Sequence, residues 1–251
     1  MLGLLDWWRR RRSRALPFPE AWREVLGRRV PFHARLVGDA RARFEEKLKV
    51  FFHTKHFIGA GGLEVDEEMK VVVSAAAARL VMNLPGEHYQ RLTEILIYPG
   101  AYHHGDRDRV VLGEAHKWGT VVLAWDAVRA GLANSQDGHD TALHEFAHVL
   151  DVADGAFDGT PVLESHAAYA PWAQVMTREF VRMRGKKALR RKGVLRRYGA
   201  TNEAEFFAVA TETFFEKPRQ MKEKHPELYE LLRDHYEVDP LAELEPRAEE
   251  A

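Results

Sequence analysis

The sequence contains no cysteine, and this absence limits both its covalent chemistry and the metal sites that it can build. No disulfide can form, and a zinc site cannot use thiolate, so metal ligands must come from histidine, aspartate or glutamate. No apolar run approaches the roughly 18–20 residues that a membrane-spanning helix needs, so no membrane span is expected. A formal net charge of −1 at pH 7 gives no overall reason to expect a nucleic-acid partner.

The chain is long enough to bury a substantial core, and its composition is that of an ordinary globular protein. Its 251 residues are 45% hydrophobic and 30% charged, which is typical of folded domains. We find no internal repeat and no clear linker between residues 17 and 240, so this range is expected to form one domain. Residues 241–251 are expected to form a frayed C-terminal tail.

The N-terminal segment, MLGLLDWWRRRRSRALPFP, does not have the order of a secretory signal peptide. A signal peptide carries its positive charge before its apolar stretch, whereas here Met1–Trp8 precede Arg9–Arg12 and no small-residue cleavage site follows. We therefore expect a cytoplasmic protein with a basic, flexible tail at residues 1–16. The alternative is a weak contact of Trp7, Trp8 and the arginines with a membrane surface or with phosphate groups, although short basic tails are usually solvated.

Periodicity and turn residues predict a mostly helical α+β domain with a small mixed sheet. From apolar residues at helical spacing and from helix-start signals, helices are predicted at 18–29, 32–52, 64–84, 141–150, 169–184 and 202–215, with shorter ones restarting at Pro218 and Pro226. From their β-branched and aromatic composition, strands are predicted at 93–98, 109–112 and 120–125.

The most informative motif is HEFAH, in which His144 and His148 are four residues apart and Glu145 directly follows the first histidine. Residues four apart lie on one face of a helix, so both imidazoles can bind one cation at roughly 2.0–2.1 Å. Glu145 is offset around the helix but lies close enough to take a proton from a water at that cation. This arrangement is typical of zinc hydrolases.

The residues around the motif favour a metal site over a pair of ordinary helix histidines. Residues 134–140, NSQDGHD, are polar and turn-rich and indicate a helix start. The following stretch, TALHEFAHVL, lacks Gly and Pro, and its apolar residues predict a mostly buried helix. Two histidines and a glutamate among so many apolar neighbours are not expected on a surface helix. We therefore place the motif on a central helix of the domain.

A catalytic zinc usually has three protein ligands and a water, so a third side chain must join the two histidines. The longer HExxHxxGxxH pattern is excluded because Asp151 and Asp154 occupy the positions of its glycine and its last histidine. Asp151 lies on nearly the same face as His148 and is better suited to orient a ligand imidazole by accepting its other N–H.

Two glutamates of a later predicted helix are the alternatives for the third ligand. Glu205 and Glu212, in TNEAEFFAVATETFFE, are seven residues apart and therefore share one helix face. Their apolar neighbours would bury them, and a buried carboxylate must be paired or bind a metal. A capping box between Asn202 and Glu205, or a buried salt bridge of Glu212, would also explain these residues, and spacing alone does not choose.

Several segments beyond HEFAH share their pattern with a known family. They lie between Pro17 and about Pro240 and read PFPEAW, ILIYP, VVLAWDAV, LHEFAHVLD, DGAFDGTP and YGATNEAEFFAVATETFF. In these segments the chain resembles the Mlc titration factor A family, cytosolic zinc peptidases of bacteria. HEFAHVLD followed later by EFFAVATE is far more specific than HExxH alone. The resemblance implies a zincin-like fold of the gluzincin type, in which a glutamate on a helix after the motif helix is the third zinc ligand.

The resemblance also implies roles for individual residues. Matching the family's PAEFFAV stretch to NEAEFFAV assigns the third ligand to Glu205 and makes Glu212 a group that supports the ligands. The family's tyrosine seven residues before the ligand falls on Tyr198, a candidate donor to a developing oxyanion. An extended peptide substrate is expected to add as a strand beside residues 120–125.

The expected activity is aminopeptidase-like hydrolysis of peptide bonds. The resemblance implies that one Zn²⁺ is held by His144, His148 and Glu205, and we expect Glu145 to take a proton from the attacking water and pass it to the leaving amine. Because family members are described as binding the glucose repressor Mlc, a link to sugar uptake is also expected. The alternative is a non-catalytic, zinc-stabilised protein that sequesters such a transcriptional repressor. Three protein ligands favour catalysis, because structural zinc sites usually have four.

The remaining charged and histidine residues are not assigned to the metal or to catalysis. The basic segment 178–197 is interpreted as a solvated loop or a substrate-docking flap that leads to the third ligand, rather than as a nucleic-acid site. Single histidines in loops are usually solvated, and we assign none of the following to the metal: His103, His104, His116 and His139.

Overall fold

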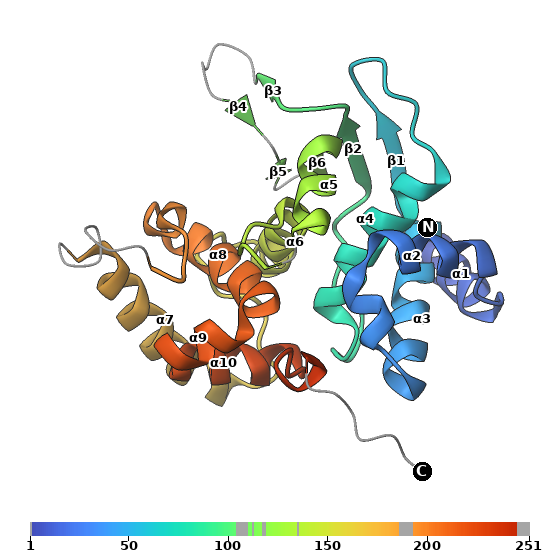
Figure 1. Ribbon diagram of the computed structural model, residues 1–251. Coiled ribbons are helices and arrows are strands. Elements are labelled where there is room, and N and C mark those ends of the chain that lie inside the picture. The colour runs from blue at the N-terminus through green and yellow to red at the C-terminus, as the bar shows by residue number, and fades with distance from the viewer. Residues whose placement is uncertain are drawn as a thin grey trace.

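The computed structural model describes residues 2–103, 110–111, 113–116, 119–134, 136–185 and 193–244. These residues form the mostly helical α+β domain that the sequence predicted. Its α-helices are α1 (Leu2–Ala15), α2 (Glu20–Arg29), α3 (Gly38–Thr54), α4 (Glu67–Val81), α5 (Trp125–Ala133), α6 (Thr141–Asp151), α7 (Tyr169–Arg184), α8 (Glu203–Glu216), α9 (Pro218–Lys224) and α10 (Pro226–Tyr236). In Figure 1, α1–α4 and α7–α10 occupy opposite sides of the molecule, with α6 between them. Within the described residues, no helix combines the length and the apolar character needed to cross a membrane.

The predicted small mixed sheet is present and has four strands. They are β1 (His56–Gly59), β2 (Glu94–Tyr98), β5 (Gly113–His116) and β6 (Thr120–Ala124), in the order β1-β2-β6-β5. The first three in that order are parallel, with Ile95 opposite Val121, and β5 runs antiparallel to β6. The side chains of Ile95 and Val121 are fully buried. Strands β3 (Tyr102–His103) and β4 (Val110–Val111) form a separate antiparallel pair.

The order of the strands corrects one expectation about substrate binding. Residues 120–125 were expected to accept a peptide as an added strand, but β6 is paired on both sides, with β2 and with β5. A strand whose two edges are already hydrogen-bonded has no free backbone groups to offer to a peptide. The edges of the sheet are instead β1 and β5, and β5 packs against the motif helix α6.

Helix α4 joins the N-terminal helices to the motif helix. Its N-terminus is capped by the Asp66 carboxylate, which accepts a hydrogen bond from the Met69 N–H at 2.8 Å. The negative charges of Glu67 and Glu68 in the first turn interact favourably with the positive end of the helix dipole. Every residue from position 71 to position 81 is buried. Helix α4 packs against α2 and α3 and also against α6, so it ties the motif helix to the N-terminal half.

Helix α6 is the central helix that the sequence predicted, and all of its residues are buried. Phe146 is fully buried, and its ring packs edge-on against Phe51 of α3 and against Tyr89, at centroid distances of 5.4 and 5.8 Å. These contacts hold the side of α6 that faces α3 and α4. The opposite part of α6 packs against α8, which lies beside it in Figure 1.

The N-terminal segment expected to be a flexible tail instead forms helix α1, which packs against α3. The buried Ser13 hydroxyl donates to the carbonyl oxygen of Lys49 at 3.0 Å. The buried Lys49 ammonium donates in turn to the carbonyl oxygens of Arg14, at 3.1 Å, and of Leu16. A cation is favourable at the C-terminal end of a helix. These contacts join residues distant in sequence, so the arginine run alone did not reveal them.

The C-terminal turn Ala242–Leu244 is fastened to α4 by the buried side chain of Arg79. Its guanidinium donates to both carboxylate oxygens of Glu243, one of them at 2.9 Å. The same guanidinium lies 4.6 Å from the ring centroid of Phe32 and 4.8 Å from that of Phe215, a favourable cation–π arrangement. Residues 242–244 of the predicted frayed tail are therefore ordered by these contacts, and residues 245–251 lie outside the described residues.

We expect Arg79→Ala to lower the free energy of unfolding by roughly 3 kcal/mol, because it leaves the Glu243 carboxylate partly buried without its cation and removes two ring contacts. Urea unfolding followed by circular dichroism measures this loss. Arg129→Ala, at an exposed position on α5, is the matched control and should change the free energy by less than about 0.5 kcal/mol. A similar change in both variants would contradict the role assigned to Arg79.

Candidate metal centre

The start of α6 fixes the direction in which the two motif histidines point. The Asp140 carboxylate caps the helix by accepting from the Leu143 N–H at 2.9 Å. His144 and His148 follow on one face, both buried, with their ring centroids 4.7 Å apart. Their Nε2 atoms lie 3.1 Å from each other. One turn of a capped, buried helix therefore directs both imidazoles to the same point, as the sequence predicted.

The start of α8 brings Glu205 to the same point. The Asn202 side chain caps α8 by accepting from the Glu205 N–H at 2.9 Å. The Glu205 carboxylate is directed at the histidines instead of back to Asn202, with Oε2 3.0 Å from His144 Nε2 and 3.4 Å from His148 Nε2. Asn202 therefore caps α8 as the sequence suggested, but the Glu205 carboxylate contacts the two histidines and does not complete a capping box.

The three converging side chains fit a tetrahedral metal ion in both spacing and chemistry. Their donor atoms are separated by 3.0, 3.1 and 3.4 Å. A tetrahedral ion with bonds of 2.0–2.1 Å requires ligand atoms about 3.3–3.4 Å apart, close to these values. Two imidazole nitrogens and one carboxylate oxygen are also a donor set that Zn²⁺ accepts. Among the described residues, His144, His148 and Glu205 are the group whose ligand atoms could hold a metal, all lying within 4.8 Å of one another.

The electrostatics of this cluster favour positive charge at its centre. Burial alone would lower the pKa of His144, but hydrogen bonds with Glu205 and Glu212 outweigh it and raise that pKa to about 10. Burial would raise the pKa of Glu205, yet its hydrogen bonds with both histidines hold that pKa well below its usual range. Burial lowers the pKa of His148 and so favours its neutral form, which is the form that binds metals. A cation at this point would take over the charge balance that a proton otherwise supplies.

Glu212 supports His144 from the side away from the cluster. It is fully buried, and its Oε1 lies 2.6 Å from His144 Nδ1. Its Oε2 accepts from the Asp140 N–H at 2.8 Å. One carboxylate thus holds both the ring of His144 and the first turn of α6. A carboxylate on Nδ1 fixes the tautomer that leaves Nε2 free for a metal.

Arg196 is a residue of this site that the sequence analysis missed. Its Nη2 donates to Glu212 Oε1, which is the oxygen that also contacts His144. Arg196 lies just before the short 3₁₀ helix Arg197–Ala200 and within the basic segment 178–197, which was interpreted as a solvated loop or a substrate-docking flap. Its position near Tyr198 was the only available signal. Of that segment, residues 186–192 lie outside the described residues.

Asp151 is buried at the end of α6 but does not make the predicted hydrogen bond to an imidazole. Its Oδ1 accepts from the Thr160 N–H at 2.8 Å, so the carboxylate holds the loop after α6. Its Oδ2 and the Nδ1 atom of His148 are both buried, and neither has a hydrogen-bond partner. Burial raises the pKa of Asp151 to about 6, whereas the charge of His148 acts to lower it. Its influence on His148 is therefore electrostatic.

Glu145 and Tyr198 lie beside the cluster on different elements. Glu145 is buried on α6, and its charge contributes to the raised pKa of His144. The Tyr198 hydroxyl donates to Glu205 Oε1 at 3.0 Å, and its ring lies 5.8 Å from that of His144. Tyr198 remains 36% exposed, so it lies on the solvent side of the cluster. The ring of Phe157, also partly exposed, lies 4.9 Å from His148.

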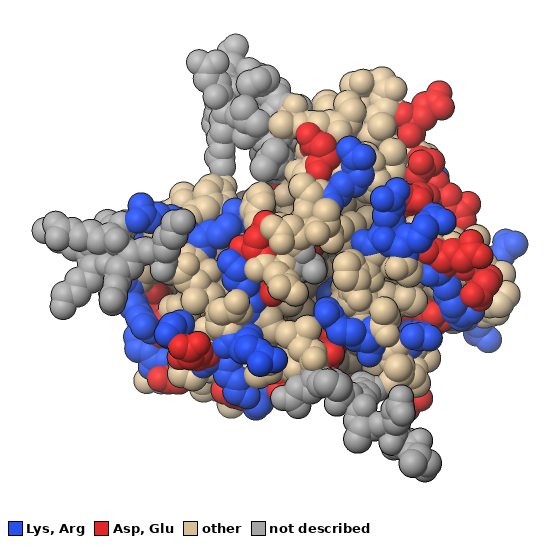
Figure 2. Space-filling view, viewed as in Figure 1, with Lys and Arg blue, Asp and Glu red and all other residues tan. Residues whose placement is uncertain are grey.

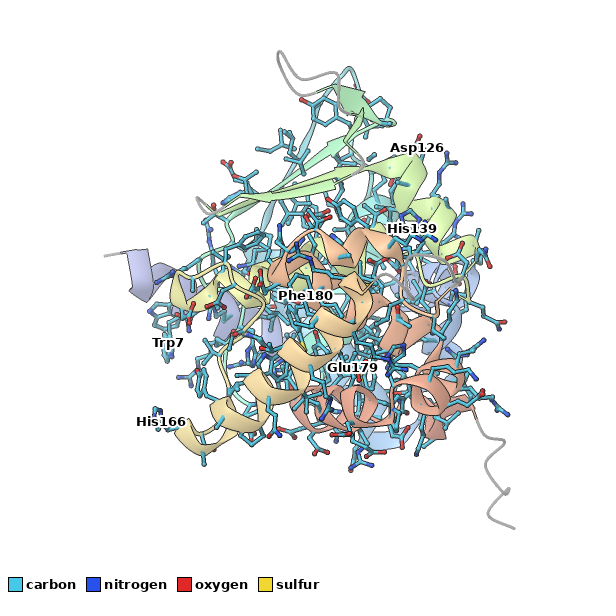
Figure 3. All side chains as sticks on the ribbon, turned by 90° about the vertical axis from the view of Figure 1, so that its left-hand side faces the viewer. Trp7, Asp126, His139, His166, Glu179 and Phe180 are labelled. Atoms are coloured by element: carbon cyan, nitrogen blue, oxygen red, sulfur yellow. The ribbon has the colours of Figure 1, made fainter. Side chains whose placement is uncertain are left out.

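The other histidines considered from the sequence do not join this cluster where the structure describes them. The N–H of His139 donates to Glu216 at 2.7 Å and to Asp137 at 2.9 Å, and Figure 3 shows His139 beside α5. The side chains of His103 and His116, and all of His104, lie outside the described part of the chain.

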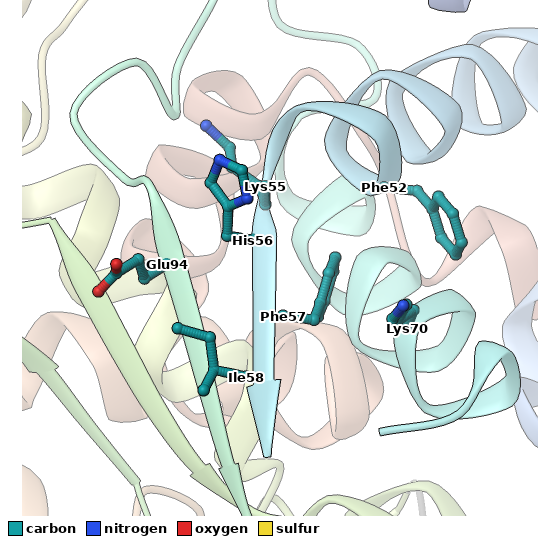
Figure 4. A pocket seen from close by; sticks show the side chains of 7 residues that line it. All are labelled: Phe52, Lys55, His56, Phe57, Ile58, Lys70 and Glu94. Carbon is teal, nitrogen blue, oxygen red and sulfur yellow. The ribbon is translucent and has the colours of Figure 1, made fainter. Parts of the chain in front are cut away.

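A separate hollow of about 620 Å³ lies at the β1 edge of the sheet and is shown in Figure 4. It is lined by Phe52, Lys55, His56, Phe57, Ile58, Lys70 and Glu94. None of these residues belongs to the His144 cluster, so the hollow is not part of the metal centre.

Comparisons with known proteins show the family to which the chain belongs. The sequence profile of the family described as glucose-regulated metallo-peptidase M90 matches residues 5–237. An uncharacterized protein of Synechocystis sp., slr2042, is 37% identical over 246 residues, which cover 93% of this chain and 90% of that protein. The Mlc titration factor A of Yersinia pestis is 28% identical over 243 residues (89% of this chain, 86% of that protein). That of Enterobacter sp. is 26% identical over 246 residues (90% and 89%). The resemblance inferred from the sequence is thus confirmed, and the chain belongs to the glucose-regulated metallo-peptidase M90 family.

Proposed function

We propose that this protein is a zinc-dependent peptidase that acts in the cytoplasm and cleaves peptides in an aminopeptidase-like manner. The observation that carries the proposal is the convergence of His144, His148 and Glu205, whose donor atoms are 3.0–3.4 Å apart. Membership of a metallo-peptidase family supports it. Three protein ligands leave a fourth tetrahedral position available, as in catalytic zinc sites.

The chain's own residues supply the groups that peptide hydrolysis requires. A bound Zn²⁺ would polarise the substrate carbonyl and lower the pKa of water to about 7. Glu145, on the same helix as the two histidines, takes a proton from the attacking water and returns it to the leaving amine. Tyr198, whose hydroxyl lies 3.0 Å from Glu205 Oε1, donates a hydrogen bond to the carbonyl oxygen as negative charge develops there. Glu212 keeps His144 in the orientation that the site requires.

The sheet offers one edge beside this site for an extended substrate. Strand β5 lies at the end of the sheet and packs against α6. A peptide that pairs with the outer edge of β5 would run past the helix that carries the catalytic residues, with main-chain hydrogen bonds providing affinity. In this proposal β5, and not residues 120–125, pairs with the substrate.

A second candidate function follows from the names of the relatives. Two of them are called Mlc titration factor A, which favours a role in binding a transcriptional repressor. In that case the metal would stabilise the fold, and Glu145 would have no chemical role. Hydrolysis of small peptides separates the two functions, because a protein that only sequesters a repressor does not need it.

We expect Glu145→Gln to lower peptide cleavage by roughly 100- to 10,000-fold, because the amide cannot accept the proton of the attacking water. Zinc content, measured by atomic emission, should remain one ion per chain. Glu203→Gln, at an exposed position in the first turn of α8, is the matched control and should retain full turnover. Normal cleavage by Glu145→Gln would remove the general-base role.

We expect Glu205→Ala to weaken zinc binding more than Glu212→Ala. Loss of Glu205 removes a ligand atom, whereas loss of Glu212 only frees the ring of His144 and costs about 10- to 100-fold in affinity. Competition of each variant with a chromogenic chelator gives the two dissociation constants. If Glu212→Ala loses more affinity than Glu205→Ala, the third ligand has been wrongly assigned.

We expect removal of the metal by a chelator to abolish hydrolysis of chromogenic aminoacyl and short peptide substrates, and one equivalent of Zn²⁺ to restore it. The treatment should also lower the melting temperature, because the metal binds the folded chain. No hydrolysis in either state, with the same loss of stability, would favour the repressor-binding function.

A further inference from the structure

Helix α1 exposes two neighbouring tryptophans. Trp7 is 49% and Trp8 61% exposed, and their rings contact each other edge-on with centroids 5.3 Å apart. The guanidinium of Arg11 lies 5.4 Å from the centroid of the Trp7 ring. Figure 3 shows Trp7 at the periphery of the molecule. Exposure of large apolar rings to water is unfavourable, and a contiguous exposed apolar patch often marks an interaction surface.

The arginines of α1 divide into two groups by their partners. Arg10 pairs with Glu87 at 3.0 Å, and Arg14 pairs with both Glu87 and Glu46. By contrast, Arg9, Arg11 and Arg12 form no ion pair with any side chain that the structure describes. The first group fastens the helix to the protein, and the second leaves positive charge directed at solvent.

The tryptophans and two of the free arginines lie on the same side of α1. At 100° per residue, Trp7, Trp8, Arg11 and Arg12 fall within about 140° of the helix circumference. Ser13, which is buried against Lys49, lies roughly opposite. Because Ser13 and Lys49 fix the rotation of α1 about its axis, this outer face is permanently directed away from α3. We call these four residues the Trp–Arg face.

We propose that the Trp–Arg face docks on the surface of an anionic lipid bilayer. Tryptophan rings prefer the boundary between acyl chains and headgroups, and arginines bind lipid phosphates bidentately. The adjacent aromatic pair favours a bilayer over nucleic acid, because a lipid boundary accepts both rings along one flat surface. Elsewhere the visible face carries acidic and basic side chains interspersed (Figure 2), and the formal net charge of the chain is −1, so net charge alone would not attract this protein to a polyanion. The proposal is independent of the peptidase function.

Flotation of the full-length protein with lipid vesicles tests this docking. Vesicles of equal phosphatidylglycerol and phosphatidylcholine should bind the protein at least tenfold more strongly than vesicles of phosphatidylcholine alone. Raising the salt from 0.05 to 0.5 M should weaken binding to the anionic vesicles, because it screens the arginines. Equal binding to both vesicles, or binding to neither, would overturn the proposal. So would binding to duplex DNA as tight as to the anionic vesicles.

Two double variants and a charge-matched control assign the binding to α1. Arg11→Ser/Arg12→Ser and Trp7→Ser/Trp8→Ser should each lower vesicle binding by roughly tenfold or more. Arg129→Ser/Arg219→Ser removes the same charge from exposed positions on α5 and α9 and should bind as the unaltered protein does. All four altered side chains of α1 are exposed, so melting temperatures should not change. An equal loss of binding in the Arg129/Arg219 variant would show a general charge effect and overturn the assignment.

Discussion

The pairing of α6 with α8 through buried carboxylates is the constraint on which the candidate metal centre depends. Glu205 and Glu212 of α8 contact the two imidazole nitrogens of His144, one on each side of the ring. Burying an imidazole and two carboxylates without such partners would cost several kcal/mol. The polar groups therefore fix the rotation of one helix against the other. Hydrophobic packing brings the helices together, and these contacts select the rotation in which three donor atoms converge.

Local signals in the sequence predicted the parts of the site that lie on one element. The HEFAH spacing, the capped start of α6 and the cap at Asn202 depend only on residues a few positions apart. The choice between Glu205 and Glu212 did not follow from spacing, because both lie on one face of α8. The choice depends on the position of α8 along the axis of α6. In the observed position, Glu205 contacts Nε2 of His144 and Glu212 contacts Nδ1. The family resemblance supplied that assignment before the geometry.

The differences from expectation arise where a side chain had a distant partner. Asp151 was expected to bind an imidazole, but the N–H of Thr160 in the following loop reaches its carboxylate. Residues 1–16 were expected to be flexible, yet the buried ammonium of Lys49 binds the end of α1. The strand predicted at residues 120–125 is present as β6 over 120–124, with Trp125 starting α5, but its neighbours in the sheet were not predicted. A local sequence pattern predicts a helix or a strand, whereas the hydrogen-bond partner of each polar side chain depends on how those elements pack.

The two inferred surfaces of the protein are separated by the packing of its helices. Helix α1 packs on α3, α3 packs on α4, and α4 packs on α6, which lies between α4 and α8 in Figure 1. The metal centre lies between α6 and α8, because His144 and Glu205 meet there. Docking of α1 on a bilayer would therefore leave α6, α4 and α3 between the lipid and the centre. Peptide substrates would still approach from the side of Tyr198, whose ring remains exposed, so membrane binding and catalysis are compatible in one molecule.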